Sequence, residues 1–219
     1  MSIAPVTPFR IRTLADLLQR LGGVSLERIL FQPYPGTARP QDVWDVERRE
    51  GKPCELIAGV LVEKATGLRE SALTAHLLDQ LNRWVQPSNL GMLSGPNRAL
   101  ELMADLVRTP DIAFTSWDRL PGGRFPETPI PRLVPNLAVE VLSRANTSGE
   151  RAVKRQDYFA AGVEVLWEID PDHRTVANLN FGEGASTMLR SGDTLTGGTV
   201  LPGFSLSLLE LFAELERRK

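Results

Sequence analysis

Three ionisable residues of this sequence have types and settings that suit the hydrolysis of a phosphate ester. Asp111 follows a proline at the start of a short apolar stretch, and Glu140 lies inside the apolar run 137–142. A carboxylate left unpaired inside a sheet is costly, so Glu140 must be paired, protonated or bound to a metal. Two neighbouring carboxylates repel each other, and a divalent cation between them removes the repulsion. The sequence therefore predicts that Asp111 and Glu140 hold a divalent metal ion, with Lys154 nearby on the next segment.

The composition restricts the kind of metal. The sequence has one cysteine, Cys54, and two histidines, His76 and His173. These are too few for a cysteine-based or histidine-rich centre, so carboxylates must bind the metal. Oxygen ligands of this type favour a hard cation such as Mg²⁺ or Mn²⁺.

Each candidate residue also has an ordinary structural interpretation. Asp111 alone suits a carboxylate at a strand edge, Glu140 suits a buried acid paired with an arginine, and Lys154 suits a solvated helix. Their combination, in this order, favours metal-assisted hydrolysis: Asp111 and Glu140 hold Mg²⁺, which polarises the phosphate and lowers the pKa of a bound water. Lys154 would orient that water or neutralise charge that develops on the phosphate.

Basic residues gather between the Glu140 strand and the helix that follows it, namely Arg144, Arg151, Lys154 and Arg155. They suit contact with a phosphate backbone. A solvated helix face explains them equally well.

A strand–helix–strand unit must position Glu140 and Lys154. Residues 136–143 form a continuous apolar run, which is typical of a strand covered on both faces. Thr147 and Glu150 predict a capping box that opens a helix ending at Gly162, and residues 163–169 predict a second strand. Such a unit is parallel with a right-handed crossover, so the helix should pass close to the end of the Glu140 strand.

The remaining pattern predicts an α/β fold, with helices and strands flanking this unit. The expected helices are 14–21 after Thr13, 43–49, 68–85 with Pro87 beyond its end, and 208–215. The expected strands are two in 54–63 with a turn at Ala58-Gly59, then 99–103, 106–108, 111–115, 176–180, 187–190 and 199–200. Residues 120–135 are an expected loop.

Length and charge limit the remaining options. The 219 residues suit one domain with a terminal extension. The net charge of −2 excludes a sequence-wide basic surface, so any contact with DNA must use a local patch. No apolar run approaches the roughly 18 residues that span a bilayer, and residues 1–12 lack a signal-peptide core. A cytoplasmic location is the expectation.

Several motifs together resemble a known family. Residues 108–114 resemble the Pro-Asp motif of the PD-(D/E)xK nuclease superfamily, and residues 137–143 resemble its second acidic strand. The ordered set is more similar to the Uma family of putative restriction endonucleases. Its further motifs match Glu-Leu-Ile-x-Gly at 55–59, Lys-x-x-x-Tyr at 154–158, Gly-Val at 162–163 before a tryptophan strand, and Leu-Pro-Gly-Phe at 201–204, so that the similarity covers about residues 40–212.

The resemblance implies a restriction-endonuclease-like domain over residues 40–219, built on a mixed sheet with flanking helices and preceded by an N-terminal helical extension over residues 1–39. It also implies that Glu55 completes the acidic cluster. One position departs from the superfamily pattern, because Leu142 stands where a lysine is expected two residues after the second acid. Such lysines can migrate to the following helix, which makes Lys154 the natural replacement.

The predicted function is a metal-dependent DNA endonuclease with Asp111, Glu140, Lys154 and Glu55 as its site. A homodimer is expected, because cutting both strands needs two active sites. Two alternatives stay open. One is a catalytically silent module that binds nucleic acid or protein on the same fold, and the other is a hydrolase of small phosphoesters.

Overall fold

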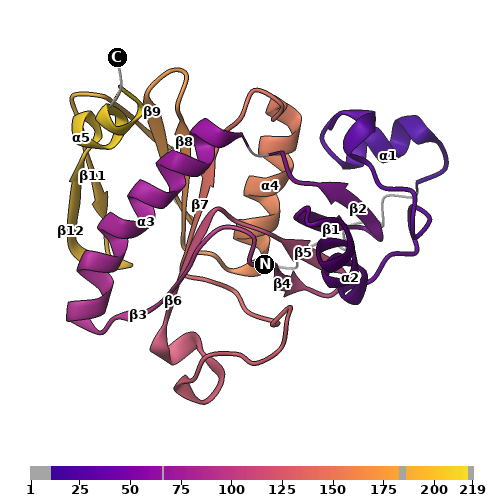
Figure 1. Ribbon diagram of the computed structural model, residues 1–219, viewed down its shortest axis with the longest axis horizontal. Coiled ribbons are helices and arrows are strands. Elements are labelled where there is room, and N and C mark those ends of the chain that lie inside the picture. Colours follow the sequence, from indigo (N-terminus) through magenta and orange to yellow (C-terminus); the bar gives the residue numbers. More distant parts are fainter. Residues whose placement is uncertain (1–10, 66, 183–185, 217–219) are drawn as a thin grey trace.

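A six-stranded mixed sheet forms the centre of the molecule (Figure 1). The computed structural model describes residues 11–65, 67–182 and 186–216. The strand order is β10-β9-β8-β7-β6-β3. The strands are β3 (Gly91–Ser94), β6 (Ile112–Ser116), β7 (Leu137–Val141), β8 (Val165–Asp170), β9 (Thr175–Asn180) and β10 (Thr187–Arg190).

The predicted strand–helix–strand unit is confirmed. Strands β7 and β8 are parallel neighbours, and α4 (Ser148–Ala161) connects them. Their register places Glu140 opposite Glu168. The other pairs of this sheet are antiparallel. Gly162 ends α4 with a φ of 102°, a left-handed conformation that favours glycine.

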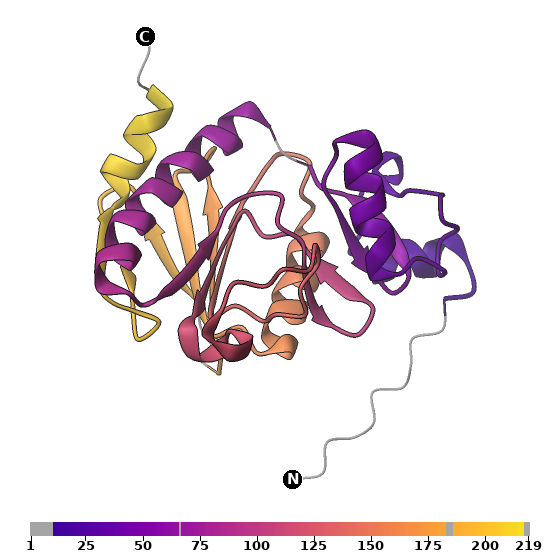
Figure 2. The same ribbon diagram turned by 60° about the horizontal axis from the view of Figure 1, so that its bottom comes forward.

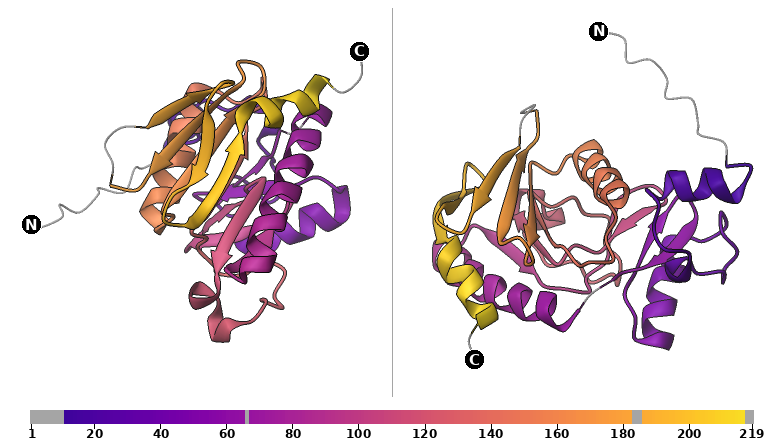
Figure 3. Two further views of the ribbon diagram at one scale, coloured as in Figure 1. Left: turned by 90° about the vertical axis from the view of Figure 1, so that its left-hand side faces the viewer. Right: turned by 90° about the horizontal axis from the view of Figure 1, so that it is seen from above.

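Helices cover both faces of the six-stranded sheet, and this explains the continuous apolar run of β7. Side chains alternate between the faces of a strand. Leu137, Val139 and Val141 join one core cluster with residues of α3 (Leu68–Ser88). Ala138 faces the other way and joins a second cluster with Tyr158 of α4. The view from above shows α3 and α4 on opposite sides of the sheet (Figure 3). Glu140, two residues beyond Ala138, therefore faces α4.

A second sheet lies beside the first and carries Glu55. Its four antiparallel strands run in the order β2-β1-β5-β4. They are β1 (Cys54–Ile57), β2 (Val60–Glu63), β4 (Leu100–Met103) and β5 (Leu106–Arg108), and α2 (Pro40–Glu50) packs against them. The chain passes from β5 directly into β6 through Thr109-Pro110-Asp111. This passage brings the two sheets together at Asp111.

The N-terminal residues pack against the start of α4. Helix α1 (Leu14–Arg20) and a 3-10 turn (Leu26–Arg28) lie beyond β1 and β2 at one side of the molecule (Figure 2). The hydroxyl of Thr147, the N-cap of α4, donates to the carbonyl of Gly22 at 2.7 Å. A Cβ at Gly22 would meet the backbone of Gly149 at 2.4 Å, so only glycine permits this close approach.

The C-terminal residues complete the core on the α3 side. A hairpin of β11 (Thr194–Gly197) and β12 (Leu201–Ser207) leads into α5 (Leu208–Ala213). Phe204 of this hairpin stacks on Trp167, with ring centroids 6.0 Å apart. Short 3-10 turns occur at Trp117–Arg119, Pro121–Gly123 and Glu214–Glu216. Among the helices of the described residues, none combines the length and apolar character that a membrane span requires.

The structure corrects several local predictions. The strand predicted at Thr199-Val200 is a turn, and the strands lie on either side of it. Helix α3 continues through Pro87 and ends one residue later at Ser88, although the proline has no N–H to donate to the helix. Only half of the predicted capping box of α4 forms. The Thr147 hydroxyl accepts from the backbone of Glu150, but the Glu150 carboxylate binds Arg28 instead.

Candidate active site

The junction of the two sheets fixes Asp111 beside the end of β7. The Asp111 backbone N–H donates to the carbonyl of Val139 at 2.9 Å. Its Oδ2 accepts a hydrogen bond from the backbone N–H of Val141 at 2.7 Å. Asp111 is therefore held through its backbone and through Oδ2, and Oδ1 is left to face other groups.

Glu140 lies on the α4 face of β7 and is bound by two residues of that helix. Lys154 Nζ lies 3.0 Å from Oε2, and the Tyr158 hydroxyl donates to Oε1 at 2.6 Å. Lys154 and Tyr158 are four residues apart on α4, a spacing that places both on one helix face. Burial raises the pKa of Glu140, and the negative charges of Asp111 and Glu55 add to this, against the opposing effect of the lysines.

A second lysine joins the two metal-ligand candidates. Lys64, directly after β2, places Nζ 2.8 Å from Asp111 Oδ1 and 3.8 Å from Glu140 Oε2. The same ammonium donates to the carbonyl of Thr109 at 2.5 Å. Both carboxylates thus contact one cationic group. Its positive charge offsets the repulsion expected between two carboxylates without a metal.

Glu55 lies in the same buried cluster, as the resemblance implied. Its Oε1 is 3.1 Å from Lys154 Nζ, and its Oε2 accepts from Arg108 at 2.7 Å. Arg108 also binds Asp157. Burial alone would raise the pKa of Glu55, but Lys154, Arg108 and Lys64 outweigh burial and hold this pKa well below its usual range. The nearest cations of Glu55 are thus a lysine and an arginine.

The structure brings all four predicted residues together, and it adds three that the sequence argument missed. These are Lys64, Tyr158 and Arg108. Tyr158 had a usable signal, because it follows Lys154 by one helical turn and belongs to the quoted Lys-x-x-x-Tyr motif. Arg108 is adjacent to the Thr-Pro-Asp motif. Lys64 had no comparable signal, since a single lysine after a short strand is usually solvated.

The four basic residues Arg144, Arg151, Lys154 and Arg155 do not form one exposed patch, because Lys154 is buried. Arg151 and Arg155 bind Glu168, with Arg155 Nε 2.6 Å from Oε1 and Arg151 Nη2 3.0 Å from Oε2. Lys154 is buried in the carboxylate cluster. Arg144 extends from the surface and binds Asp172 at 2.9 Å. Lys154 and Arg155 diverge because successive helix positions face different directions.

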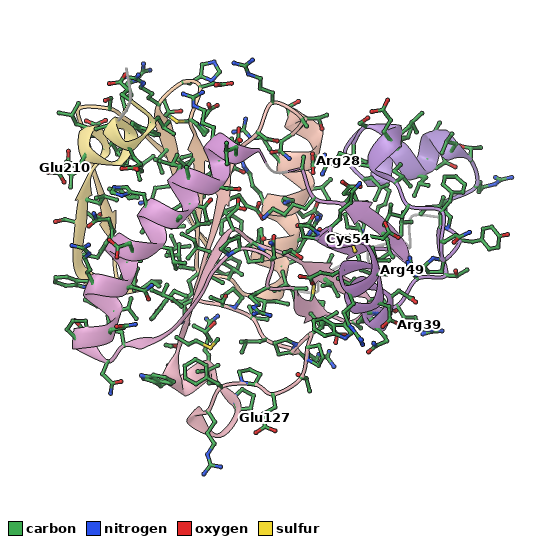
Figure 4. The ribbon with its side chains drawn as sticks, in the orientation of Figure 1. Arg28, Arg39, Arg49, Cys54, Glu127 and Glu210 are labelled. Atoms are coloured by element: carbon green, nitrogen blue, oxygen red, sulfur yellow. The ribbon has the colours of Figure 1, made fainter. Side chains whose placement is uncertain are left out.

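A surface cleft of about 440 Å³ opens beside the carboxylate cluster. Lys64, Arg28, Ser143 and Arg144 are among the residues that line it. Arg28 lies between α4 and the N-terminal helices (Figure 4). Its guanidinium binds both carboxylate oxygens of Glu150, at 2.8 and 2.9 Å, and its Nε donates to the carbonyl of Glu63. Lys64 therefore connects the buried cluster to a cleft whose lining carries both basic residues, Arg28 and Arg144, and acidic ones, Glu63 and Glu70.

Asp111 and Glu140 offer oxygen donors of the kind that hard divalent cations prefer. Among the described residues, no group of three or more histidine, cysteine, aspartate or glutamate side chains is arranged to hold a metal. Asp111 and Glu140 supply two carboxylates, and both already contact one cation. Mg²⁺ is typically bound by one or two carboxylates together with water and phosphate oxygens. The donor set suits that mode rather than a closed protein cage.

Comparisons with known proteins agree with this architecture. Residues 40–209 match the model of the Uma2 family, described as "putative restriction endonuclease". A search of curated proteins found no match. The chain is similar in structure to a putative nuclease belonging to DUF820 from Anabaena variabilis, with a TM-score of 0.67 and 20% sequence identity over 75% of this chain and 92% of that one. At this identity the likeness shows the fold.

Proposed function

This chain belongs to the Uma2 family of putative restriction endonucleases, and on that premise we propose that it is a metal-dependent DNA endonuclease with its active site at Asp111, Glu140, Lys154 and Glu55. One observation carries the proposal. The Asp111 and Glu140 carboxylates, from antiparallel neighbouring strands, contact the same ammonium group at 2.8 and 3.8 Å. Such a pair can accept a divalent cation at the same place.

Asp111 and Glu140 would hold the cation, Mg²⁺ or Mn²⁺. When bound, this cation supplies Lewis-acid polarisation of the phosphate and a lowered pKa for a coordinated water. Asp111 is preorganised for the task because the Val141 backbone N–H fixes one of its oxygens. Glu140 is preorganised by the Tyr158 hydroxyl.

Lys154 supplies positive charge next to the ligands. Burial would lower the pKa of its ammonium, but Glu140 and Glu55 outweigh burial and raise it, so this lysine stays protonated. A fixed cation in a buried setting stabilises charge that develops on a phosphate. Glu55 and Arg108 orient it: Glu55 lies 3.1 Å from Lys154 and is itself held by Arg108 at 2.7 Å.

The direct test is nicking of supercoiled plasmid with Mg²⁺ or Mn²⁺. The wild-type protein should cut, and Asp111→Asn should reduce the rate by about 10²-fold or more, as for loss of one preorganised electrostatic group. Glu168→Gln is the matched control, because Glu168 is an equally buried strand glutamate outside the proposed site. Equal rates for wild type and Asp111→Asn would refute the proposed site.

One observation favours a second candidate function, a binding module without turnover. Every oxygen of Asp111 and Glu140 already has a protein donor, from Val141, Lys64, Lys154 or Tyr158. A protein that has lost catalysis could keep such a cluster for stability alone. DNA binding by the wild-type protein without metal binding and without cleavage under any metal condition would favour this candidate.

We also propose that residues 1–39 act as an extension that supports the domain over residues 40–219. The contacts of Arg28 with Glu150 and of Gly22 with Thr147 support this division, since they join the extension to the start of α4. Double-strand cleavage would require two copies of the site, so a homodimer on DNA is expected. Sedimentation with and without a DNA duplex tests that assembly.

A further inference from the structure

We infer that Lys64 occupies the cation position of the Asp111–Glu140 pair and must leave it, toward the adjacent cleft, when a divalent metal binds. This inference rests on the proposed function and adds a regulatory role for a lysine at the same site. It makes Lys64 a competitor of the metal.

The hydrogen bonds of the two carboxylates show where a metal could enter. Asp111 Oδ2 is held by the Val141 backbone N–H at 2.7 Å, and strand pairing fixes that N–H. Glu140 Oε1 is held by the Tyr158 hydroxyl at 2.6 Å. The remaining two oxygens are Asp111 Oδ1, which is 2.8 Å from Lys64, and Glu140 Oε2, which is 3.0 Å from Lys154 and 3.8 Å from Lys64. Lys64 is thus the cation that contacts both acids. A cation shared by the two acids must therefore take the place of the Lys64 ammonium.

Lys64 and Lys154 differ in how easily each can leave. Lys154 lies between two carboxylates, 3.0 Å from Glu140 and 3.1 Å from Glu55, and it extends from the interior face of α4. Lys64 has Asp111 as its nearest carboxylate, with the Thr109 carbonyl as its other close acceptor. If a metal takes Asp111 Oδ1, Lys64 loses that ion pair while Lys154 keeps Glu55.

Lys64 lies beside a cleft that could receive its ammonium group. Its side chain is 6% exposed where it pairs with Asp111. Yet Lys64 also lines the cleft of about 440 Å³ together with Ser143 and Arg144. The backbone of Lys64 is held by a hydrogen bond to the carbonyl of Pro53. A rotation of the side chain alone would carry the ammonium into this cleft, whose lining includes the carboxylates of Glu63 and Glu70.

Mn²⁺ binding by titration calorimetry tests the inference without using activity. Lys64→Met keeps length and apolar bulk but removes the charge, so it should bind Mn²⁺ at least about tenfold more tightly than wild type, because a competing cation is lost. Lys52→Met is the control, since Lys52 is an exposed lysine that pairs with Glu63 at the surface. Its affinity should match that of wild type. Equal or weaker binding by Lys64→Met would overturn the inference.

A second measurement uses the unmodified chain and does not depend on the folding of a variant. The rate of acetylation at Lys64, followed by peptide mass spectrometry, should rise several-fold when Mn²⁺ is added, because the ammonium moves into the cleft. The rate at Lys52 should not change. A Lys64 rate that stays constant or falls with Mn²⁺ would also overturn the inference.

Asp111→Asn separates this inference from the proposed function. Where wild type binds Mn²⁺ and Asp111→Asn does not, but Lys64→Met matches wild type, the metal site stands and the displacement of Lys64 is wrong. Where Asp111→Asn and wild type bind Mn²⁺ equally, or neither wild type nor Lys64→Met binds it, the metal site itself fails and the inference fails with it.

Discussion

Two buried glutamates lie side by side in this protein, and their surroundings differ in an instructive way. Glu140 and Glu168 are register partners on the parallel strands β7 and β8, and both face α4. Each is bound by two residues of α4 that are four positions apart. Glu140 has Lys154 and Tyr158, whereas Glu168 has Arg151 and Arg155.

The partners on the far sides also differ. Beyond Glu140 lies Asp111, a second carboxylate at the start of the next strand. On the side away from Glu140, Glu168 is opposite Ala177 of β9, which carries no charge. Arginine is permanently charged and binds a carboxylate through a fork of donors, which saturates the acid. The lysine ammonium is a compact charge with a flexible stem.

This comparison shows that burial and pairing do not by themselves identify a site. Both glutamates are nearly inaccessible, at 5% and 3% exposure. The difference lies in the second carboxylate and in the type of cation. We therefore propose a structural role for Glu168 and a chemical role for Glu140, and the following predictions test that proposal.

The largest expected effect is on cleavage by the two glutamine variants. Glu140→Gln removes a proposed metal ligand and should lower the rate of plasmid nicking by about 10³-fold, at the upper end for one electrostatic group. Glu168→Gln should keep the rate within a few-fold of wild type. Its expected cost is in stability, about 1–2 kcal/mol, because Arg151 and Arg155 are about one-third exposed and water can solvate them.

Circular dichroism and thermal melting must accompany these rates. If Glu168→Gln is folded and loses as much cleavage as Glu140→Gln, the proposal that only Glu140 belongs to the active site is wrong.

The second prediction compares two neighbouring basic residues of α4. Lys154→Met should reduce turnover by about 10²-fold, because it removes a preorganised charge beside the proposed ligands. Metal affinity should not fall, since Lys154 is not a ligand. Arg155→Met removes an equal charge one residue away, directed at Glu168, and should change turnover only a few-fold. Single-turnover rates at saturating Mg²⁺ measure both, and similar losses would indicate a general electrostatic effect of the helix.

The sequence could predict the parts of this contrast that depend on local patterns, but not those that depend on contacts between residues far apart in the chain. The β7–α4–β8 unit was predictable, because an apolar run, an N-cap threonine and a C-terminal glycine are local patterns. Asp111 and Glu140 followed from carboxylates in apolar surroundings. Lys64 could not be predicted, since its partner Asp111 is 47 residues away in the sequence and belongs to another sheet.

The two sets of α4 partners also show the limit of the sequence argument. The basic residues 151, 154 and 155 form one cluster in the sequence, whereas the helix directs Lys154 to Glu140 and Arg151 and Arg155 to Glu168. The spacing of four already separated them into two faces. Which acid each face would meet required the parallel register of β7 and β8.

The third prediction concerns the hydrogen bond that distinguishes Glu140 from Glu168. Tyr158→Phe removes the donor to Glu140 Oε1 and should cost about 1.5–3 kcal/mol of unfolding free energy, as for a bond to a charged group. Turnover should fall by about tenfold or less, because Lys154 still contacts Glu140. Urea unfolding and nicking rates measure the two effects. A Tyr158→Phe protein as inactive as Glu140→Gln would show that the hydroxyl takes part in the reaction itself.

The smallest expected effect is a difference in how stability depends on pH, and it compares Glu140 with Glu55. Burial raises the folded-state pKa of Glu140 above its ordinary value of 4.5. Between those two values the folded state binds more protons than the unfolded state, so the contribution of Glu140 to stability falls as pH rises. Glu140→Gln lacks this loss. Wild type should therefore become less stable relative to Glu140→Gln as pH rises above about 4.5.

Glu55 should behave in the opposite way. Burial alone would raise its pKa, but Lys154 and Arg108 outweigh burial and depress the folded-state value below the ordinary 4.5. Its contribution is then fully present above 4.5 and is lost as pH falls through the folded-state pKa. The difference between wild type and Glu55→Gln should be constant from pH 5 to 8, while the difference for Glu140→Gln changes over the same range. Urea unfolding of the three proteins across that range measures both differences. If the two differences in unfolding free energy varied with pH in the same way, the two acids would share one environment. Glu140 would then not differ from Glu55 in the way that its proposed role requires.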